Sequence, residues 1–314
     1  MKLISIVTPT FNEEDNIEEI YNEVKKVMQG FPNYAYEHIF IDNASTDTTV
    51  EKLKAKAKID KSLKIIVNSR NFGAIRSPYY GHLQAKGDAV VDIPADLQDP
   101  PALIADFIKK WEEGFKVVVG VKTISRENSV MYFIRSVYYK ILKKVSETEI
   151  VEHSTGFGLY DKSVIEIMKK IDDPYPLFRS VVSEIGFERA KVEYVQERRK
   201  KGISSGNYSK SFYRLYDAGV LGIMSSSKLP LRIAIFLGFI MSFLSLLVSI
   251  GYLVLKIFLG VHFQVGFASL IIGLFFFLSV QLFFIGVLGE YIGAIYTQVL
   301  RRPIVIEKER INFD

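Results

Sequence analysis

The chain has 314 residues, of which 49% are hydrophobic, with a formal net charge of +5 and no cysteine. This length fits one large domain or a domain with an appendage, and the lack of cysteine excludes disulfides, thiolate metal sites and cysteine nucleophiles. The basic balance does not indicate a nucleic-acid partner, because the basic residues gather beside apolar stretches and no groove-reading motif is present.

Up to about residue 228 the chain has the mixed, charged sequence of a globular domain. Runs of β-branched and aliphatic residues predict strands at 3–9, 36–42, 63–68, 88–93 and 116–121. Apolar residues at helical spacing predict helices at 13–28, 48–58 and 103–113. Strands that alternate with helices predict an α/β fold with a mostly parallel sheet and helices on both faces.

Polar clusters follow four of the predicted strands, at the points where the strands end. They are residues 9–13, 42–45, 68–73 and 96–98. Ligands of open α/β sheets bind at the carboxyl ends of the strands, so these clusters predict a binding site at one edge of the sheet. The sequence has neither G-x-G-x-x-G nor G-x-x-x-x-G-K-[ST], which argues against a Rossmann dinucleotide site and a P-loop.

Asp96 and Gln98 form the most informative of these clusters. They follow a buried strand, and Pro100 and Pro101 stop the segment soon after them. Carboxylate and amide oxygens are hard ligands that suit Mg²⁺ or Mn²⁺, and such ions commonly lie between a protein carboxylate and a phosphate. The alternative is a proline-terminated turn whose acids face water.

Two apolar stretches, at about 233–255 and 267–289, are each long enough to cross a bilayer as a helix. Burial in a soluble core is the alternative, and it is not favoured because neither stretch has a polar face. The short linker 260–264 predicts a two-helix transmembrane hairpin with both chain ends on one side. The outer ends are flanked by Lys228, Arg232, Arg301, Arg302, Lys308 and Arg310, against Lys256 near the linker. The positive-inside rule therefore predicts that the large domain lies in the cytoplasm.

The resulting organisation has four parts: a domain at 1–205, an amphipathic juxtamembrane linker at 206–230, two transmembrane helices within 231–300 and a cytoplasmic tail at 301–314. The chain opens directly with a strand, so we expect no cleavable signal peptide. Residues 131–145 and 208–223 have amphipathic patterns that predict helices on the membrane surface. Packing on the sheet or on another subunit is the alternative for both. Glycines in the apolar stretches are consistent with a homo-oligomer.

The ordered set of motifs resembles that of the inverting nucleotide-sugar glycosyltransferases of family 2, which have the GT-A fold. The matching segments are 7–14, 41–49, 71–73, 95–101 and 155–161, within a region of about residues 3–205. The resemblance is closest to the polyprenyl-phosphate glycosyltransferases, which include bactoprenol glucosyltransferases and dolichyl-phosphate mannose synthases. The two-helix hairpin also fits the bactoprenol branch. Each segment is a weak signal by itself, whereas the ordered set is specific.

The resemblance implies a role for each matching residue. The nucleotide sugar is expected to bind at Pro9, Phe11, Glu13, Asp42, Asn71, Gly73, Asp96 and Arg199. Asp96 and Gln98 are expected to bind Mg²⁺ or Mn²⁺ and, with Arg199, to stabilise the departing nucleoside diphosphate. Lys122, Arg126 and Arg135 are expected to hold the acceptor phosphate. Without the ordered set, Phe11 would be interpreted as a core side chain and Glu13 as a charge in the first turn of a helix.

The sequence departs from the family pattern at several positions. Pro94 stands where the family commonly has the first acid of Asp-x-Asp, so metal binding rests on Asp96, its neighbouring amide and the donor diphosphate. Asp92 lies two residues before Pro94, too far back for a clear substitute. Asn43 replaces the second acid of the usual Asp-Asp-Gly-Ser, and Lys122 stands where the family often has Arg.

The expected activity is transfer of a hexose, glucose or N-acetylglucosamine, from a UDP-sugar to polyprenyl (undecaprenyl) phosphate at the cytoplasmic membrane face. The acceptor is already an anion, so the main task is to hold two phosphate groups in line rather than to supply a strong base. A processive polysaccharide synthase is less favoured, because such enzymes usually carry Gln-x-x-Arg-Trp and Trp111 is the only tryptophan. A catalytically inactive, membrane-anchored sugar-nucleotide-binding protein is the other alternative. It is retained because Pro94 replaces the first acid of the family's metal motif.

Overall fold

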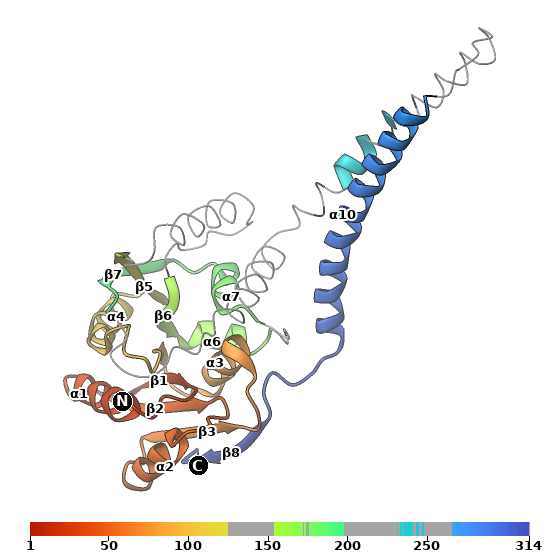
Figure 1. Cartoon of the computed structure of the whole chain (residues 1–314). Coiled ribbons are helices and arrows are strands. Elements are labelled where there is room, and N and C mark those ends of the chain that lie inside the picture. The colour runs from red at the N-terminus through yellow and green to blue at the C-terminus, as the bar shows by residue number, and fades with distance from the viewer. Residues whose placement is uncertain are drawn as a thin grey trace. The chain divides into compact units, whose positions relative to one another are not determined.

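The structure, a computed structural model, describes residues 1–124, 154–171, 173, 176–197 and 266–313, together with separate residues between 231 and 247. The chain divides into two compact units, and each is described by itself (Figure 1). The first unit contains Met1–Ser225 and Arg301–Asp314, and the second contains Ser226–Leu300. The two ends of the chain therefore belong to the same unit.

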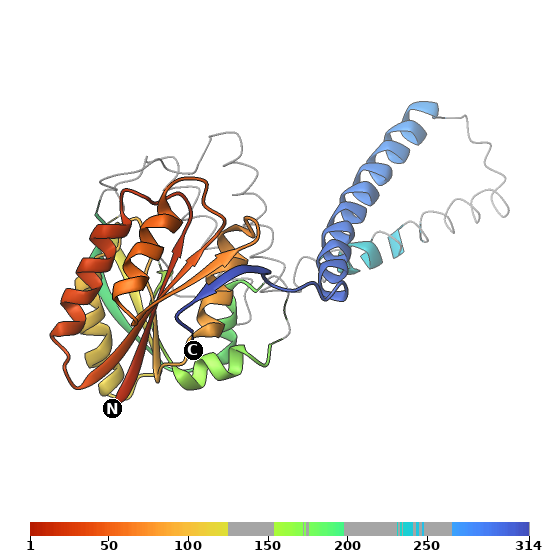
Figure 2. The same ribbon diagram turned by 90° about the horizontal axis from the view of Figure 1, so that it is seen from below.

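An eight-stranded sheet forms the centre of the first unit. Its strands are β1 (Lys2–Thr10), β2 (Tyr34–Asp42), β3 (Leu63–Asn68), β4 (Ala89–Asp92), β5 (Val117–Ile124), β6 (Ser154–Asp161), β7 (Arg189–Val195) and β8 (Glu307–Ile311). In spatial order they run β7-β5-β6-β4-β1-β2-β3-β8. Figure 2 shows the blue strand β8 lying beside the orange strand β3, so the last strand of the chain completes the sheet next to the third.

Parallel pairing joins β4 to β1, β1 to β2 and β2 to β3. Val7 lies opposite Asp92, and Thr10 lies opposite Asp42. Antiparallel pairing places β6 between β4 and β5 and adds β8 to β3, while β7 pairs in parallel with β5. The sheet is therefore mixed, and the parallel pairs among its first four strands agree with the mostly parallel sheet expected from the sequence.

Helices cover both faces of this sheet, as expected (Figure 2). One face carries α1 (Ile17–Gln29), α2 (Thr49–Ile59), η1 (Pro101–Leu103) and α4 (Ile104–Glu112), and the other carries α3 (Gly73–Gln84), α6 (Lys162–Met168) and α7 (Phe178–Ile185). Successive residues of a strand point to opposite faces. Accordingly, Ile6 and Phe40 pack in one core, whereas Val7 and Ile41 pack in the other.

Two helices differ from the sequence prediction. The helix expected at 13–28 begins at Ile17, because the Glu13 carbonyl accepts two backbone hydrogen bonds in a turn before it. Helix α3 is absent from the sequence prediction, since its internal Pro78 interrupts the helical pattern. Gly81 of α3 lies against the sheet, where an added Cβ would be only 2.9 Å from Val7 Cγ1. The missing side chain allows the helix to pack close to β1.

The C-terminal segment also differs from its predicted form. It was expected to be a cytoplasmic tail at 301–314, and it contains β8 and belongs to the first unit. The strand has the charged sequence Glu-Lys-Glu-Arg-Ile with half-buried and exposed side chains. Such a sequence carries no strong apolar alternation, so its role as a strand depends on the partner β3 rather than on its own pattern.

The second unit contains α10 (Phe267–Val299), a helix of 33 residues. Within the part of the chain that the structure describes, Phe276–Val299 is the one helical stretch long and apolar enough to cross a membrane, with mean hydropathy 1.7. Large apolar side chains such as Phe283 are exposed along it. The helix expected to end near residue 289 continues to Val299, because no proline interrupts it before Pro303.

Several predicted features lie outside the described residues. Most of the first expected membrane helix, 233–255, is among them, although residues 235–240 are helical. The amphipathic helices expected at 131–145 and 208–223 also fall there. An added Cβ at Gly238, Gly286, Gly289 or Gly293 meets no described atom within 4 Å. The two-helix hairpin and the homo-oligomer therefore stay predictions.

Candidate functional site

The carboxyl ends of β4, β1, β2 and β3 lie next to one another, because these strands are adjacent and parallel. The four polar clusters therefore meet at one edge of the sheet, which we call the candidate site. The expected site residues on these strand ends and loops are Pro9, Phe11, Glu13, Asp42, Asn71, Gly73, Asp96 and Gln98.

Hydrogen bonds join the loops that follow β1 and β2. The Asn12 N–H donates to Ser45 Oγ (2.9 Å), and the Glu13 N–H donates to Thr49 Oγ1 (3.0 Å) at the start of α2. Asn12 has a φ of 55°, a left-handed conformation that asparagine tolerates better than most residues. These contacts fix the half-buried Phe11 beside the end of β2.

Glu13 also has a local contact. Its Oε2 accepts a hydrogen bond from Asn16 Nδ2 (2.6 Å), immediately before α1. Glu13 therefore lies in the turn before α1, and its alternative interpretation as a charge in the first turn of the helix is wrong. A role in binding the donor stays a proposal.

Asp42 is the last residue of β2 and is fully buried. Its carboxylate accepts hydrogen bonds from the Ser45 N–H (2.9 Å), from the Ser45 hydroxyl and from Thr10 Oγ1 (3.4 Å). Burial raises the pKa of Asp42, and the hydrogen bonds from Ser45 and Thr10 oppose the rise. The protein therefore holds this carboxyl in one orientation at the strand end.

Asn43 is the centre of a hydrogen-bond network whose partners the sequence analysis missed. Its Nδ2 donates to Asn71 Oδ1 (3.0 Å) and to the Gly73 carbonyl oxygen (3.2 Å). Its Oδ1 accepts from the Phe72 N–H (2.8 Å) and from Asn68 Nδ2 (3.2 Å). A side-chain amide supplies two donors and two lone pairs, and here all are used. Because an ionised aspartate has no donor, this departure from the family pattern gives the loop after β3 an anchor that an acid could not provide.

Asp96 and Gln98 lie in the turn that follows β4. Leu97 between them has a φ of 55° and belongs to the buried core, whereas its two neighbours are half-buried. The Gln98 N–H donates to Asp96 Oδ1 (3.2 Å). Among the described residues, no group of three or more His, Cys, Asp or Glu could hold a metal ion. The turn fits Mg²⁺ or Mn²⁺ bound through one carboxylate and substrate phosphates, rather than an all-protein metal site.

Asp99 and Lys122 lie beside this turn. Tyr194 Oη donates to Asp99 Oδ1 (2.5 Å), and Lys122 Nζ lies 3.8 Å from the same oxygen. Burial raises the pKa of Asp99, and the Tyr194 hydrogen bond and the charge of Lys122 oppose the rise. The structure therefore places Lys122 of β5 next to the loop that carries Asp96.

Asp92 ends β4 and contacts α3. Its Oδ1 lies 3.2 Å from Nε2 of the buried His82, without the angle of a hydrogen bond. The His82 ring stacks on Phe178, with 4.6 Å between the ring centroids. Gly156 of β6 has a φ of +102°, and an added Cβ there would lie 3.5 Å from Asp92 Oδ2. Asp92 therefore lies between α3 and β6 at the carboxyl end of β4.

The remaining predicted residues, Arg126, Arg135 and Arg199, lie outside the described part of the chain. Arg199 follows Glu197 by two residues, and the Glu197 N–H donates to the Gln98 carbonyl oxygen (3.0 Å). Glu197, the last described residue before Arg199, therefore lies beside the turn of Asp96.

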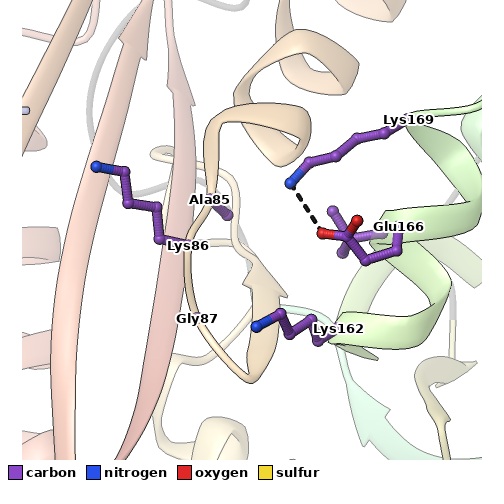
Figure 3. A pocket seen from close by; sticks show the side chains of 7 residues that line it. Ala85, Lys86, Gly87, Lys162, Glu166 and Lys169 are labelled. Atoms are coloured by element: carbon purple, nitrogen blue, oxygen red, sulfur yellow. Dashed lines mark hydrogen bonds and ion pairs between the residues drawn. The ribbon is translucent and has the colours of Figure 1, made fainter.

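A pocket of about 300 Å³ lies elsewhere in the first unit (Figure 3). Its lining residues are Ala85, Lys86, Gly87, Lys162, Ile165, Glu166 and Lys169. Lys169 pairs with Glu166 at 3.2 Å, as the dashed line in the figure shows. Gly87 precedes the first residue of β4, so the pocket lies at the amino end of this strand, opposite the candidate site.

Residues 5–168 match the family described as Glycosyl transferase family 2. The chain is 36% identical over 313 residues to the uncharacterized glycosyltransferase YkcC of Bacillus subtilis, across 99% of this chain and 94% of the relative. It is 33% identical over 307 residues to a prophage-derived bactoprenol glucosyl transferase of Shigella flexneri, across 98% and 97% of the two chains. A solved structure of a mannosyltransferase from Pyrobaculum calidifontis, in complex with GDP-Man and Mn²⁺, superposes with TM-score 0.49 and 18% identity, across 70% of this chain and 62% of that one.

The family match covers more than half of the chain, and the two curated relatives are similar along nearly its whole length. The mixed sheet between two layers of helices agrees with the expected GT-A fold. The resemblance drawn from the ordered motifs is confirmed. The chain belongs to glycosyl transferase family 2, and the protein is a glycosyltransferase.

Proposed function

We propose that the protein transfers a hexose from a UDP-sugar to a polyprenyl phosphate at the cytoplasmic face of the membrane. The observation that carries this proposal is the similarity, along nearly the whole chain, to a protein named bactoprenol glucosyl transferase. The apolar helix α10 supports a lipid acceptor, because such an acceptor stays in the bilayer. Glucose and N-acetylglucosamine are the proposed sugars.

The donor is proposed to bind at the candidate site. The nucleoside part would contact Pro9, Phe11, Glu13 and Asp42, at the ends of β1 and β2. The ring of Phe11 would pack on the ribose or the base, and the two carboxylates would accept hydrogen bonds from ribose hydroxyls or a base imide. Asn71 and Gly73 would complete this part of the site, on the loop that Asn43 anchors.

The diphosphate of the donor is proposed to bind next to Asp96 and Gln98, which would hold Mg²⁺ or Mn²⁺ with it. The bound ion would offset the negative charge that grows on the leaving diphosphate. Arg199 is proposed to supply a second positive charge at the same place. The contact between Glu197 and Gln98, two residues before Arg199, supports this assignment.

In the proposed reaction, an oxygen of the polyprenyl phosphate attacks the anomeric carbon of the sugar. The bond between that carbon and the diphosphate breaks, its electron pair leaves with UDP, and the configuration inverts. The attacking oxygen is already anionic, so no proton has to be removed. Lys122, Arg126 and Arg135 are proposed to hold the acceptor phosphate. The location of Lys122 next to the loop that carries Asp96, where the donor diphosphate is proposed to bind, supports this for the first of them.

The sheet supports a two-pass membrane anchor. β7 precedes the apolar stretches and β8 follows them, yet both strands belong to one sheet. This pairing supports a chain that lies on the same side of a membrane before residue 198 and after residue 300. If α10 crosses once, a second crossing is proposed between residues 198 and 266, where the stretch 233–255 has the required length. We place the catalytic domain in the cytoplasm, as the basic residues at the outer ends favour.

A transfer assay tests this proposal. Purified full-length protein is incubated with undecaprenyl phosphate, Mg²⁺ and each member of a panel of radiolabelled UDP- and GDP-sugars. Label that enters the organic phase from one UDP-sugar, and that EDTA abolishes, supports the proposal and identifies the sugar. Label from a GDP-sugar alone contradicts the assignment of the nucleotide.

Two other outcomes contradict the proposed reaction. Label that appears in a polymer, and not in the organic phase, indicates a processive synthase. If no donor yields product while nucleotide still binds, an inactive binding protein is favoured. The replacement of the first acid by Pro94 is then the feature to examine.

A further inference from the structure

Strand β8 returns the end of the chain to the catalytic domain, where it pairs with β3. β3 ends at Asn68 and leads directly into the loop that carries Asn71. The C-terminal segment 303–311 therefore lies along the strand whose loop is proposed to bind the donor.

This segment contacts the loop and the first turn of α3 directly. The Ser69 N–H donates to the Ile306 carbonyl oxygen (2.9 Å), and the Arg76 guanidinium donates to the Pro303 carbonyl oxygen. The same guanidinium lies over the Phe72 ring, 5.1 Å from its centroid. The C-terminal segment therefore binds the region 69–76 at two points, one on each side of Phe72 in the sequence.

Other contacts hold the segment, directly or through the next residue, Asn312, without involving the loop. Tyr80 Oη of α3 donates to Glu307 Oε1 (2.9 Å). Asn312 Nδ2 donates to the carbonyl oxygens of Ala57 and Leu63, at 2.8 and 2.9 Å. These anchors lie on α3, on α2 and at the start of β3, so they can be removed without a change in the loop itself.

We propose that segment 303–311 is a clamp that positions the donor-binding loop 69–73. Asn43 holds the loop through its side-chain amide, and the clamp holds it through Ser69 and Arg76. A loop that is ordered before its ligand arrives loses less conformational entropy on binding. The clamp therefore strengthens donor binding more than it affects the lipid acceptor. The identity of this loop as donor-binding rests on the proposed function.

Variants of the anchors test the clamp. The double variant Glu307→Ala/Asn312→Ala removes the hydrogen bond from Tyr80, the ion pair between Glu307 and Arg310 and both bonds from Asn312, and Asn312→Ala alone is a milder variant. The control Tyr34→Phe removes a hydrogen bond of the same kind, from Tyr34 Oη to Glu112 Oε1 (2.6 Å), at the amino end of β2. Each full-length protein is compared by hydrogen–deuterium exchange and by steady-state kinetics.

In the double variant, we expect amide exchange of residues 69–76 to rise about tenfold, with smaller changes in the single variant. The KM for the donor rises about threefold to tenfold, while kcat and the KM for the lipid change by less than about twofold. Tyr34→Phe leaves all of these values unchanged. The clamp is overturned if exchange or the donor KM stays the same in the double variant. It is also overturned if both KM values rise together, since that indicates general loosening of the domain.

Nucleotide affinity separates this inference from the proposed function. Calorimetric titration with UDP and GDP requires neither lipid nor transfer. If the wild-type protein forms no labelled lipid, weaker nucleotide binding by the double variant still supports the clamp while the proposed transfer fails. If labelled lipid forms and the double variant binds nucleotide as tightly as the wild type, the clamp fails while the transfer stands.

Discussion

Asp96 and Asp99 lie three residues apart, yet their surroundings differ. Asp99 is buried, accepts a hydrogen bond from Tyr194 and lies near Lys122. Asp96 is half-buried, and its Oδ1 accepts the Gln98 N–H. A carboxylate that is engaged by a buried tyrosine and a lysine is less available to an external ligand than one at the surface of a turn. The geometry favours Asp96 for contact with the donor and Asp99 for support of the turn.

Asp96→Asn tests this division. The change keeps the size of the side chain and removes its charge, so we expect kcat of transfer to fall about a hundredfold or more. The measurement is turnover across a range of Mg²⁺ concentrations. Asp106→Asn, at an exposed position of α4, is the control and should behave as the wild type. Full turnover in Asp96→Asn would remove the metal assignment.

Asn43→Asp tests the amide network. The acid cannot donate to Asn71 Oδ1 or to the Gly73 carbonyl, so two hydrogen bonds are lost and lone pairs face one another. We expect the free energy of unfolding to fall by about 1–3 kcal/mol and the KM for the donor to rise. Thermal midpoints and donor kinetics measure the two effects. Asn33→Asp, in the exposed turn before β2, is the matched control. An unchanged donor KM would contradict a role for the network in binding.

For the consecutive residues Asp42 and Asn43, the sequence predicts the position but not the hydrogen-bond partners. Their place at the end of β2 is predictable, because a buried apolar run stops there. Their hydrogen-bond partners are not predictable. Asp42 accepts from Ser45, three residues later, whereas Asn43 donates to Asn71 in another loop. Hydrogen-bond partners depend on which loops the tertiary structure brings together, and a local pattern does not contain that information.

Among the elements, the first four strands along the chain were the most predictable. They are buried, and therefore have the continuous β-branched and aliphatic runs of parallel strands. Helix α3 escaped prediction because Pro78 and Gly81 weaken its pattern, although the close packing on β1 needs the glycine. β8 escaped because its charged sequence becomes a strand only through pairing with β3.

His38 in β2 predicts a dependence of stability on pH. It is buried beside Thr8, with 2.9 Å between Nε2 and Oγ1, and burial lowers its pKa from 6.5 to about 3. The unfolded chain takes up a proton below pH 6.5, whereas the folded protein does not. The contribution of His38 to the free energy of unfolding is therefore complete above pH 6.5 and falls by up to about 1.4 kcal/mol per pH unit in more acidic solution.

His38→Gln removes this proton uptake. We expect the variant to be less stable than the wild type at pH 8, because the contact with Thr8 changes, and the difference to shrink as the pH falls from 6.5 to 4. Thermal midpoints followed by the fluorescence of Trp111, the only tryptophan, measure the difference in the full-length protein. A difference that stays constant across this range would contradict the assigned pKa of His38.

For the whole molecule, the absence of cysteine allows the proposed membrane topology to be tested with single introduced thiols. Ile59→Cys places a thiol at a position of the catalytic domain that is 90% exposed, and His262→Cys places one between the two apolar stretches. With a thiol reagent that does not cross membranes, we expect intact spheroplasts to label only His262→Cys. Permeabilised cells should label both. Labelling of Ile59→Cys in intact spheroplasts would contradict a cytoplasmic catalytic domain.

The pairing of β3 with β8 also has a consequence for synthesis. The ribosome makes β3 early, but its partner emerges only after the whole of α10. Until then β3 is an open edge, a form that sheets normally protect because it invites pairing with other chains. Translation therefore produces the apolar stretches before the strand that completes the sheet. We expect the edge of β3 to stay open until β8 has emerged, so a chain cut off before β8 would keep an unprotected strand.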